Sequence, residues 1–208
     1  MSILDLFEKG GPVVWVLAGY SVIALGIALD RFVLLFLAQK PPSDINEALS
    51  SEYLDYSNSP EAYVARSMLE AVDEGVTDLD RVASRAGTQE VVRMERGLRT
   101  MAFMGNTAPL LGLLGTIVGM IKAFMVIELA GGKVDAQALA GGIWEAMITT
   151  GVGLAVSLPT LFLLHFLEGI VDRRAHSIKR LASIIIERRQ KHNARILEDA
   201  SRHIEEVV

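Results

Sequence analysis

The chain has 208 residues, of which 51% are hydrophobic, and its mean hydropathy of +0.37 is typical of an integral membrane protein. Cysteine is absent, which excludes disulfides, thiol chemistry and zinc–thiolate sites, and the formal net charge of -5 does not indicate a nucleic-acid partner. The sequence also lacks the glycine motifs that bind nucleotide phosphates, so we expect neither a cofactor nor a metal site.

The first apolar segment runs from Val13 to about Ala38 and is interrupted by Asp30 and Arg31. A helix of about 20 apolar residues crosses the hydrocarbon core of a bilayer, so this segment is long enough to span. A cleaved signal peptide is the alternative, but the residues before Val13 are not basic and no small-residue cleavage site follows. Residues 1–40 are therefore predicted to form an outer N-terminus and the first transmembrane helix.

Residues 41–100 are predicted to form a helical cytoplasmic loop. Signals that begin a helix occur at three places: Asp44 with Glu47, Ser59 before Pro60, and Thr77 with Asp80. Apolar residues recur every three or four positions, which predicts one helical face: Leu69, Val72, Val76, Leu79, Ala83 and Ala86. No proline interrupts residues 78–108, so the helix that begins near Thr77 is expected to continue into the second span.

The second span, residues 101–130, contains the stretch NTAPLLGLLGTIVG at positions 106–119. Gly112, Gly115 and Gly119 follow one another at three- and four-residue spacing, and small residues allow close approach of helix backbones in lipid. Alone, this motif predicts only that the helix packs against another helix. Thr116 lies in the same stretch, where its hydroxyl either bonds back to its own helix or serves a function. Lys122 is expected to snorkel toward the outer interface.

The third span, residues 138–168, follows a short outer link of residues 131–137 and contains Glu145. A charged side chain at membrane depth costs on the order of 3 kcal/mol on insertion scales. At about 100° per residue, the polar residues of this span share one broad face: Glu145, Thr149, Thr150, Ser157 and Thr160. Such a face predicts a lined pathway for a proton or small cation. The alternative is that Glu145 simply reaches interfacial water.

Residues 169–208 are predicted to form a helical cytoplasmic tail. Pro159 is the last proline of the chain and is tolerable in a membrane helix, so the third span and the tail are predicted to be able to form one rod of about 60 residues, roughly 90 Å long. A rod of this length favours packing against other copies of the chain, although contacts within one chain are an open alternative. Lys and Arg in the flanks place the N-terminus outside and the tail in the cytoplasm.

Catalysis is not indicated. Ser157 and His165 are the serine–histidine pair within the spans, and eight residues of helix separate them by about 12 Å. They cannot share a hydrogen bond on one helix, and His165 is interpreted as an interfacial anchor. The sequence thus predicts an all-α integral membrane protein with three transmembrane helices and long cytoplasmic helical extensions, and not an enzyme.

Two stretches carry a resemblance to a known family. APLLGLLGTIVGMIKAF (108–124) and GGIWEAMITTGVGLAVSLPTLFLLH (141–165) resemble the ExbB/TolQ/MotA proton-channel family, and most closely its ExbB/TolQ branch. The match holds in order, spacing and topology and covers the second and third spans. The MotA branch generally lacks the glutamate and has four spans, so Glu145 and three spans argue against it.

The resemblance implies a location and partners. It implies a subunit of a five-membered ring in the bacterial inner membrane, with a periplasmic N-terminus and a cytoplasmic C-terminus. The ring's second and third spans would surround the single span of an ExbD- or TolR-like partner that carries a membrane aspartate. Proton passage would drive motion that is transmitted to a TonB- or TolA-like protein. A passive membrane scaffold that conducts no ions is the alternative function.

The resemblance also implies roles for individual residues. Glu145, Thr116 and Thr150 match the family's pathway residues, with Thr149 as a second candidate hydroxyl beside Thr150. Pro109 and Pro159 match the family's prolines. Two positions depart from the pattern: His165 stands where an asparagine is expected, and Lys122 where a neutral or acidic residue is commoner.

Overall fold

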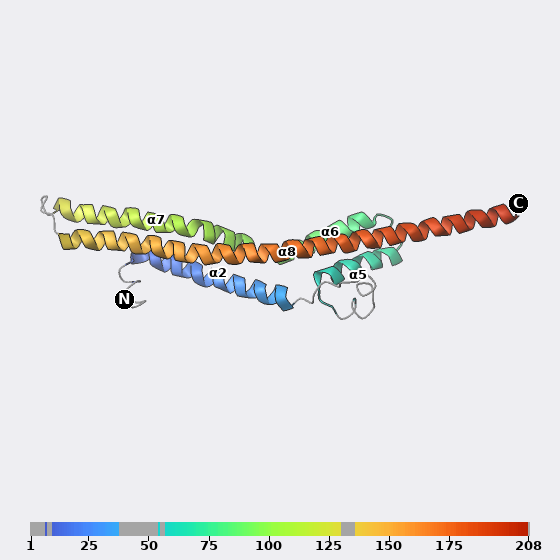
Figure 1. The fold of residues 1–208 in the computed structure, drawn as a ribbon, viewed down its shortest axis with the longest axis horizontal. Helices are drawn as coiled ribbons and strands as arrows, with labels where there is room; N and C mark the ends of the chain where they lie inside the picture. The colour runs from blue at the N-terminus through green and yellow to red at the C-terminus, as the bar shows by residue number, and fades with distance from the viewer. Residues whose placement is uncertain (1–6, 8–9, 38–53, 55–56, 130–135, 208) are drawn as a thin grey trace. The chain divides into compact units, whose positions relative to one another are not determined.

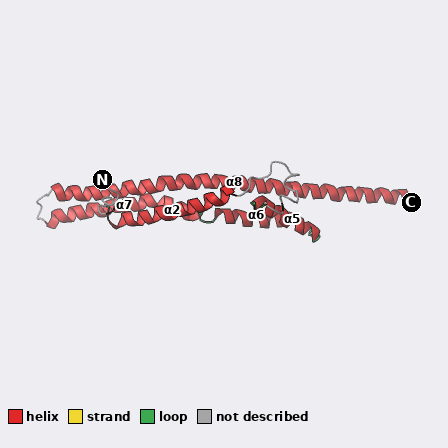
Figure 2. Cartoon of the chain, turned by 90° about the horizontal axis from the view of Figure 1, so that it is seen from below, coloured by secondary structure: helices red, strands yellow, loops and turns green. Residues whose placement is uncertain are grey.

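The computed structural model describes residue 7, residues 10–37, residue 54, and residues 57–129 and 136–207. The helices with described bounds are α2 (Gly11–Leu37), α5 (Pro60–Asp73), α6 (Leu79–Glu95), α7 (Leu98–Leu129) and α8 (Ala136–Val207) (Figure 1). Figure 2 shows no strand in the described part of the chain. The predicted capping pair Asp44–Glu47 lies outside the described residues, as does most of the link between the second and third spans.

Among the described residues, three helices have the length and composition of membrane spans. They are Gly11–Leu35 within α2, Leu98–Leu129 as the whole of α7, and a stretch of α8 within Leu139–Asp199. These segments overlap the three apolar segments that the sequence predicts, and the prediction of an all-α chain with three candidate spans is confirmed.

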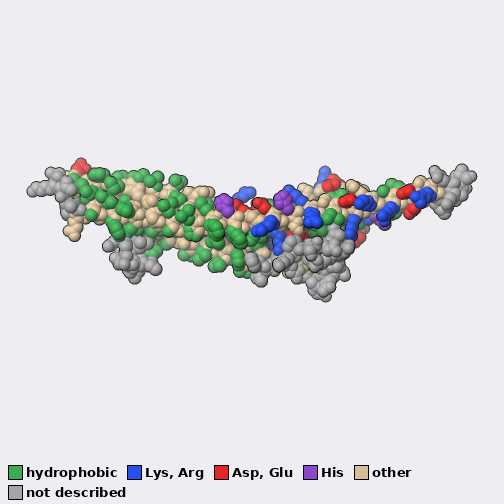
Figure 3. Space-filling model, viewed as in Figure 1, with side chains coloured by type: hydrophobic (Ala, Val, Ile, Leu, Met, Phe, Trp, Pro, Cys, Tyr) green, Lys and Arg blue, Asp and Glu red, His purple; other side chains and the backbone are tan. Residues whose placement is uncertain are grey.

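The chain divides into two compact units. The apolar unit consists of the described residues of Met1–Phe32 and Gly97–Glu168, and the polar unit of those of Val33–Arg96 and Gly169–Val208. On the face seen in Figure 3, hydrophobic side chains are spread over the apolar unit, whereas charged side chains are frequent on the polar unit.

In the apolar unit, α7 and α8 run antiparallel, with Gly119 beside Gly142 near one end and Gly105 beside Leu161 near the other. α2 lies along them, since its first residue Gly11 approaches Glu145 and its Ile27 approaches Gly97 (Figure 1). The first half of α8 is therefore in contact with both other spans.

The predicted continuous helix from residue 78 into the second span is wrong. α6 ends at Glu95, Arg96 is extended with φ -57° and ψ 125°, and Gly97 has a φ of +87° before α7 begins at Leu98. A left-handed φ is accessible to glycine without steric cost, so Gly97 permits the break without a proline. A β-carbon at Gly97 would also lie 2.9 Å from Cγ2 of Ile27, so the close approach of α2 requires glycine here as well.

The predicted single apolar face over residues 69–86 is also wrong. α5 ends at Asp73 and Gly75 has a φ of +76°, so Val76 lies in a turn and is 39% exposed. Of the two helix starts within the described residues, Ser59 with Pro60 is confirmed, because the Ser59 hydroxyl accepts a hydrogen bond from the backbone N–H of Ala62. At the second start the cap is Asp78 and not Thr77, since the Asp78 carboxylate accepts from the N–H of Arg81.

The predicted continuous helix through the third span and the tail is confirmed, and it is longer than expected. α8 contains 72 residues and continues through Pro159 without a break. In the polar unit its apolar residues Val171, Ile178, Leu181 and Ile185 are buried, whereas residues 190–199 are exposed.

The polar unit contains a buried ion pair that connects α5 to α8. Arg174 Nη1 lies 3.3 Å from Oε1 and 3.1 Å from Oε2 of Glu61, and the Glu61 side chain is fully buried. Glu61 is in the first turn of α5, where the helix dipole also favours a carboxylate. The pair therefore fixes one position of α5 against α8.

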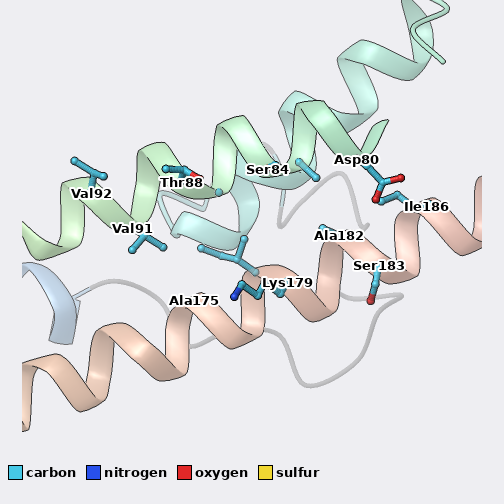
Figure 4. A pocket seen from close by; sticks show the side chains of 13 residues that line it. Asp80, Ser84, Thr88, Val91, Val92, Ala175, Lys179, Ala182, Ser183 and Ile186 are labelled. Carbon is cyan, nitrogen blue, oxygen red and sulfur yellow. The ribbon is translucent and has the colours of Figure 1, made fainter. Parts of the chain in front are cut away.

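A groove of about 490 Å³ lies between α6 and the polar-unit part of α8. Figure 4 shows side chains of the two helices, among them Thr88 and Val91 of α6 and Lys179 and Ala182 of α8, lining it from opposite sides. A β-carbon at Gly87 would lie 3.3 Å from Cγ2 of Ile178, so the helices approach closely beside it.

Candidate functional site

The glycines of α7 lie directly against α8. A β-carbon at Gly112 would lie 2.9 Å from the carbonyl oxygen of Thr149, and one at Gly119 would lie 3.0 Å from that of Gly142. One at Gly115 would lie 2.5 Å from Cβ of Thr149. Each position leaves no room for even a methyl group without a shift. The spacing of the glycines thus matches a contact between two helices of the same chain.

The threonines on α8 occupy different environments. Thr149 is 1% exposed against Gly115, and its hydroxyl donates to the carbonyl of Ala146 on its own helix. Thr150 is half-buried, and its hydroxyl donates across to the carbonyl of Gly112 at 3.3 Å. Thr116 on α7 is also half-buried, and its hydroxyl bonds back to Leu113 at 2.6 Å. Of the two neighbouring candidates, Thr150 is the one that is not enclosed between the helices.

A second hydroxyl crosses between the helices at a proline. Pro109 lies inside α7 and has no N–H, so the carbonyl of Gly105, four residues earlier, lacks its helical donor. The buried Ser157 hydroxyl of α8 donates to that carbonyl at 2.7 Å. An unsatisfied backbone group in a membrane costs several kcal/mol, so this bond supports the proline where it stands.

Ser157→Ala is expected to destabilise the packing of α7 on α8 by about 1–2 kcal/mol, because the Gly105 carbonyl then loses its donor in an apolar contact. Thermal unfolding in mild detergent measures the effect. The matched control is Thr160→Val, since the buried Thr160 hydroxyl bonds to Val156 of its own helix. Pro109→Ala in the Ser157→Ala background restores an N–H and should recover stability, and equal stability of all variants would contradict this account.

Glu145 of α8 forms an ion pair with a lysine of the neighbouring span. Its Oε1 accepts a hydrogen bond of 2.6 Å from Nζ of Lys122 on α7. The Lys122 side chain is 51% exposed and that of Glu145 is 21% exposed. A β-carbon at Gly11, the first residue of α2, would lie 2.9 Å from the same Oε1. All three spans therefore meet at one carboxylate oxygen.

His165 and Pro159 lie toward the other end of the same unit. His165 is exposed and its Nδ1 is 2.7 Å from the carbonyl oxygen of Leu161, so it contacts its own helix. Pro159 is exposed within the continuous α8. The structure therefore pairs Glu145 with Lys122 and Thr150 with the Gly112 carbonyl. His165 bonds to its own helix, whereas Ser157 bonds to α7.

Sequence reasoning missed the Lys122–Glu145 pair, the approach of Gly11 and the role of Ser157. The sequence did contain a signal for Ser157, because Pro109 in a membrane helix leaves the carbonyl of Gly105 without its helical donor, and a hydroxyl on another helix can replace that donor. No group of three or more potential metal-ligating side chains occurs among the described residues. The arrangement offers one carboxylate, one ammonium and two half-buried hydroxyls, which suits ion handling.

Comparisons with known proteins agree on one family. Residues 56–180, more than half of the chain, match the model of the MotA/TolQ/ExbB proton channel family. The match covers α5, α6, α7 and the first part of α8.

The chain is also similar to individual proteins. It is 32% identical over 185 residues to a putative ExbB-like biopolymer transport protein of Synechocystis, covering 83% of this chain and 73% of that protein. It is 26% identical over 190 residues to a putative ExbB homologue of Methanothermobacter thermautotrophicus, covering 86% of this chain and 67% of that protein. A biopolymer transport protein ExbB of Xanthomonas campestris is 37% identical over 92 residues, 44% of this chain and 36% of that protein.

Proposed function

Because the chain belongs to the MotA/TolQ/ExbB proton channel family, we propose that it is a ring subunit of an inner-membrane proton channel that couples proton flow to transport. Membership places it among transport and channel proteins and not among enzymes. The chain is an all-α membrane protein. Its relatives are named as biopolymer transport proteins, which supports an ExbB-like role in transport.

The finer proposal is that Glu145, Thr116 and Thr150 line or gate the proton route. The observation that carries it is the placement of a carboxylate and two half-buried hydroxyls on α7 and α8, the two spans that would line the pore by resemblance to the family. An ionisable residue within a membrane span is a functional candidate by default. Thr149 was a further candidate, but its burial against Gly115 supports a packing role instead.

Assembly with other chains belongs to the same proposal. The described part of α7 exposes large apolar side chains that need lipid or other helices as neighbours: Phe103, Leu110, Leu114, Ile117, Ile121 and Phe124. Three spans are too few to enclose a pathway, so the polar residues must meet other copies or a partner. We assign that partner to an ExbD- or TolR-like single-span protein with a membrane aspartate, acting with a TonB- or TolA-like protein, in a homo-pentamer whose N-termini are periplasmic.

Glu145→Gln, Thr116→Val and Thr150→Val are each expected to lower proton flux at least about tenfold, since the first removes the ionisable carboxyl and the other two each remove a hydroxyl from the route. Flux is measured in vesicles that contain the chain co-expressed with its neighbouring genes. The flux is divided by the amount of assembled complex, and the mass of that complex is determined in mild detergent. The matched control is Thr107→Val, because Thr107 is, like Thr116, a half-buried threonine of α7 whose hydroxyl bonds back to its own helix, at 2.7 Å to Phe103, but it is not part of the proposed route.

The passive scaffold gives the opposite result. It predicts that the threonine and glutamate variants leave motor-dependent growth intact, while substitutions at Gly115 or Gly119 abolish assembly. One observation favours the scaffold function, because Gly115 and Gly119 lie at the contact between two helices of the subunit. Full growth of the Glu145→Gln strain would decide for the scaffold.

A further inference from the structure

The two side chains of the Lys122–Glu145 ion pair differ in how far they are exposed. Nζ of Lys122 lies 2.6 Å from Oε1 of Glu145, the length of a strong charge-assisted hydrogen bond. The glutamate is the more enclosed partner, with 21% of its side chain exposed against 51% for the lysine. A partly enclosed carboxylate is stabilised by a nearby positive group, and within the described residues Lys122 supplies one from the neighbouring helix.

α2 contributes to the same point. Gly11 has a φ of +64°, which side chains rarely adopt, and a β-carbon there would lie 2.9 Å from Oε1 and 3.8 Å from Cδ of Glu145. The absence of a side chain is therefore what lets the carboxylate occupy its place. Gly11 also begins a helix of 27 residues, whose N-terminal end carries partial positive charge that favours an adjacent anion.

We propose that Lys122 and Gly11 are positioning residues for Glu145, which hold its carboxylate at the junction of the three spans; this inference rests on the proposed proton pathway. Lys122 sets the direction of the side chain through Oε1, and Gly11 leaves the space into which that oxygen projects. A displacement of about 1 Å in a reacting group can change a rate by 10²-fold. Proton flux therefore depends on these two residues only through Glu145.

The interpretation of Lys122 as a snorkelling side chain makes a different prediction. A lysine that only reaches for the interface can be replaced by methionine without consequence for the pathway, whether or not Glu145 is present. A lysine that positions Glu145 loses its effect on flux once Glu145 is gone. The two interpretations thus separate in a double-mutant cycle, in which residues that act as a unit are non-additive.

The experiment measures proton flux per assembled complex for the parent and for Lys122→Met, Lys122→Arg, Glu145→Gln and Lys122→Met/Glu145→Gln. We expect Lys122→Met to lower flux about tenfold, Lys122→Arg to retain most of it, and the double variant to equal Glu145→Gln. The control is Glu128→Gln, which removes a charge from an exposed site near the same end of α7 and should leave flux unchanged.

Gly11→Ala tests the second positioning residue against Gly19→Ala on the same helix, where a β-carbon would meet nothing within 4 Å. We expect Gly11→Ala to lower flux severalfold and Gly19→Ala to leave it unchanged. Because alanine at position 11 also strains the backbone, Gly11→Ala is repeated in the Glu145→Gln background, where a role through Glu145 leaves no further loss.

Each outcome has a consequence. Unchanged flux in Lys122→Met, or losses that multiply in the double variant, overturns the positioning role while the proposed pathway stands. Loss of assembled complex in Lys122→Met without loss of flux per complex makes the pair structural and also overturns it. A parent that conducts no protons overturns the proposed function, and the positioning role falls with it.

Discussion

Glu61→Ala is expected to destabilise the polar unit by about 3–5 kcal/mol, a loss comparable to the whole stability of a marginal domain. The substitution removes the buried carboxylate whose two oxygens lie 3.1 and 3.3 Å from Nη1 of the buried Arg174. Removing one side of a buried ion pair takes away its attraction, while the remaining charge still carries the desolvation cost of its burial. Glu61 is also in the first turn of α5, so the dipole interaction is lost as well.

Thermal unfolding in mild detergent and limited proteolysis of the polar unit measure this effect. The matched control is Glu187→Gln, which removes an exposed carboxylate paired with Lys191 at 2.6 Å on one helix. The hydrogen bond and the charge of Lys191 hold the pKa of Glu187 below its usual range, but an exposed pair contributes little to stability. Glu61→Leu with Arg174→Met should recover much of the loss, and a Glu61→Ala protein as stable as its parent would contradict the assigned role of the pair.

Helix starts that depend on local chemistry were predictable from the sequence. Ser59 before Pro60 combines a hydroxyl cap with a residue whose φ suits the first helical turn, and both effects act within four residues. Helix ends at Gly75 and Gly97 were not predicted, because glycine permits a left-handed φ without requiring it. At Gly97 the close approach of Ile27 from a distant segment accompanies the break, and the sequence does not reveal that neighbour.

The candidate site shows the same limit. Periodicity placed Glu145 and the threonines of α8 on one broad face, but it did not say what that face would meet. Lys122 and Glu145 are 23 positions apart on different helices, so their contact depends on the register of α7 against α8. That register is set by the glycines, which the sequence identified only as a surface for some other helix. The structure supplies the register, and with it the assignment of Thr149 to the contact.

The glycine contact also connects packing to the proposed pathway. Gly115 receives Thr149, and the next residue, Thr150, then reaches the carbonyl of Gly112. A shift of one helix along the other would move Thr150 and Glu145 together, because both belong to α8. Substitutions at the glycines should therefore affect the pathway through the subunit's own fold.

Gly115→Ala is expected to destabilise the packing of α7 on α8 by about 1–3 kcal/mol, the usual range for an overpacked contact. The added β-carbon would lie 2.5 Å from both Cβ and Oγ1 of Thr149 and 2.8 Å from its Cγ2. Thr149 is 1% exposed, so it has no open space into which it can move, and one helix must shift instead. The thermal unfolding temperature in detergent should fall, and the yield of assembled complex should fall with it.

Gly151→Ala is the control, because Gly151 is two residues from Thr149 on α8 and a β-carbon there would meet nothing within 4 Å. Alanine is the better helix former by about 1 kcal/mol, so this variant should be as stable as the parent or more stable. Thr149→Gly in the Gly115→Ala background removes the three atoms that the new methyl group meets, and should recover part of the loss. A Gly115→Ala protein that unfolds like its parent would show that α7 and α8 do not meet at this register. The contacts of Thr150 with Gly112 and of Glu145 with Lys122 would then be contradicted as well.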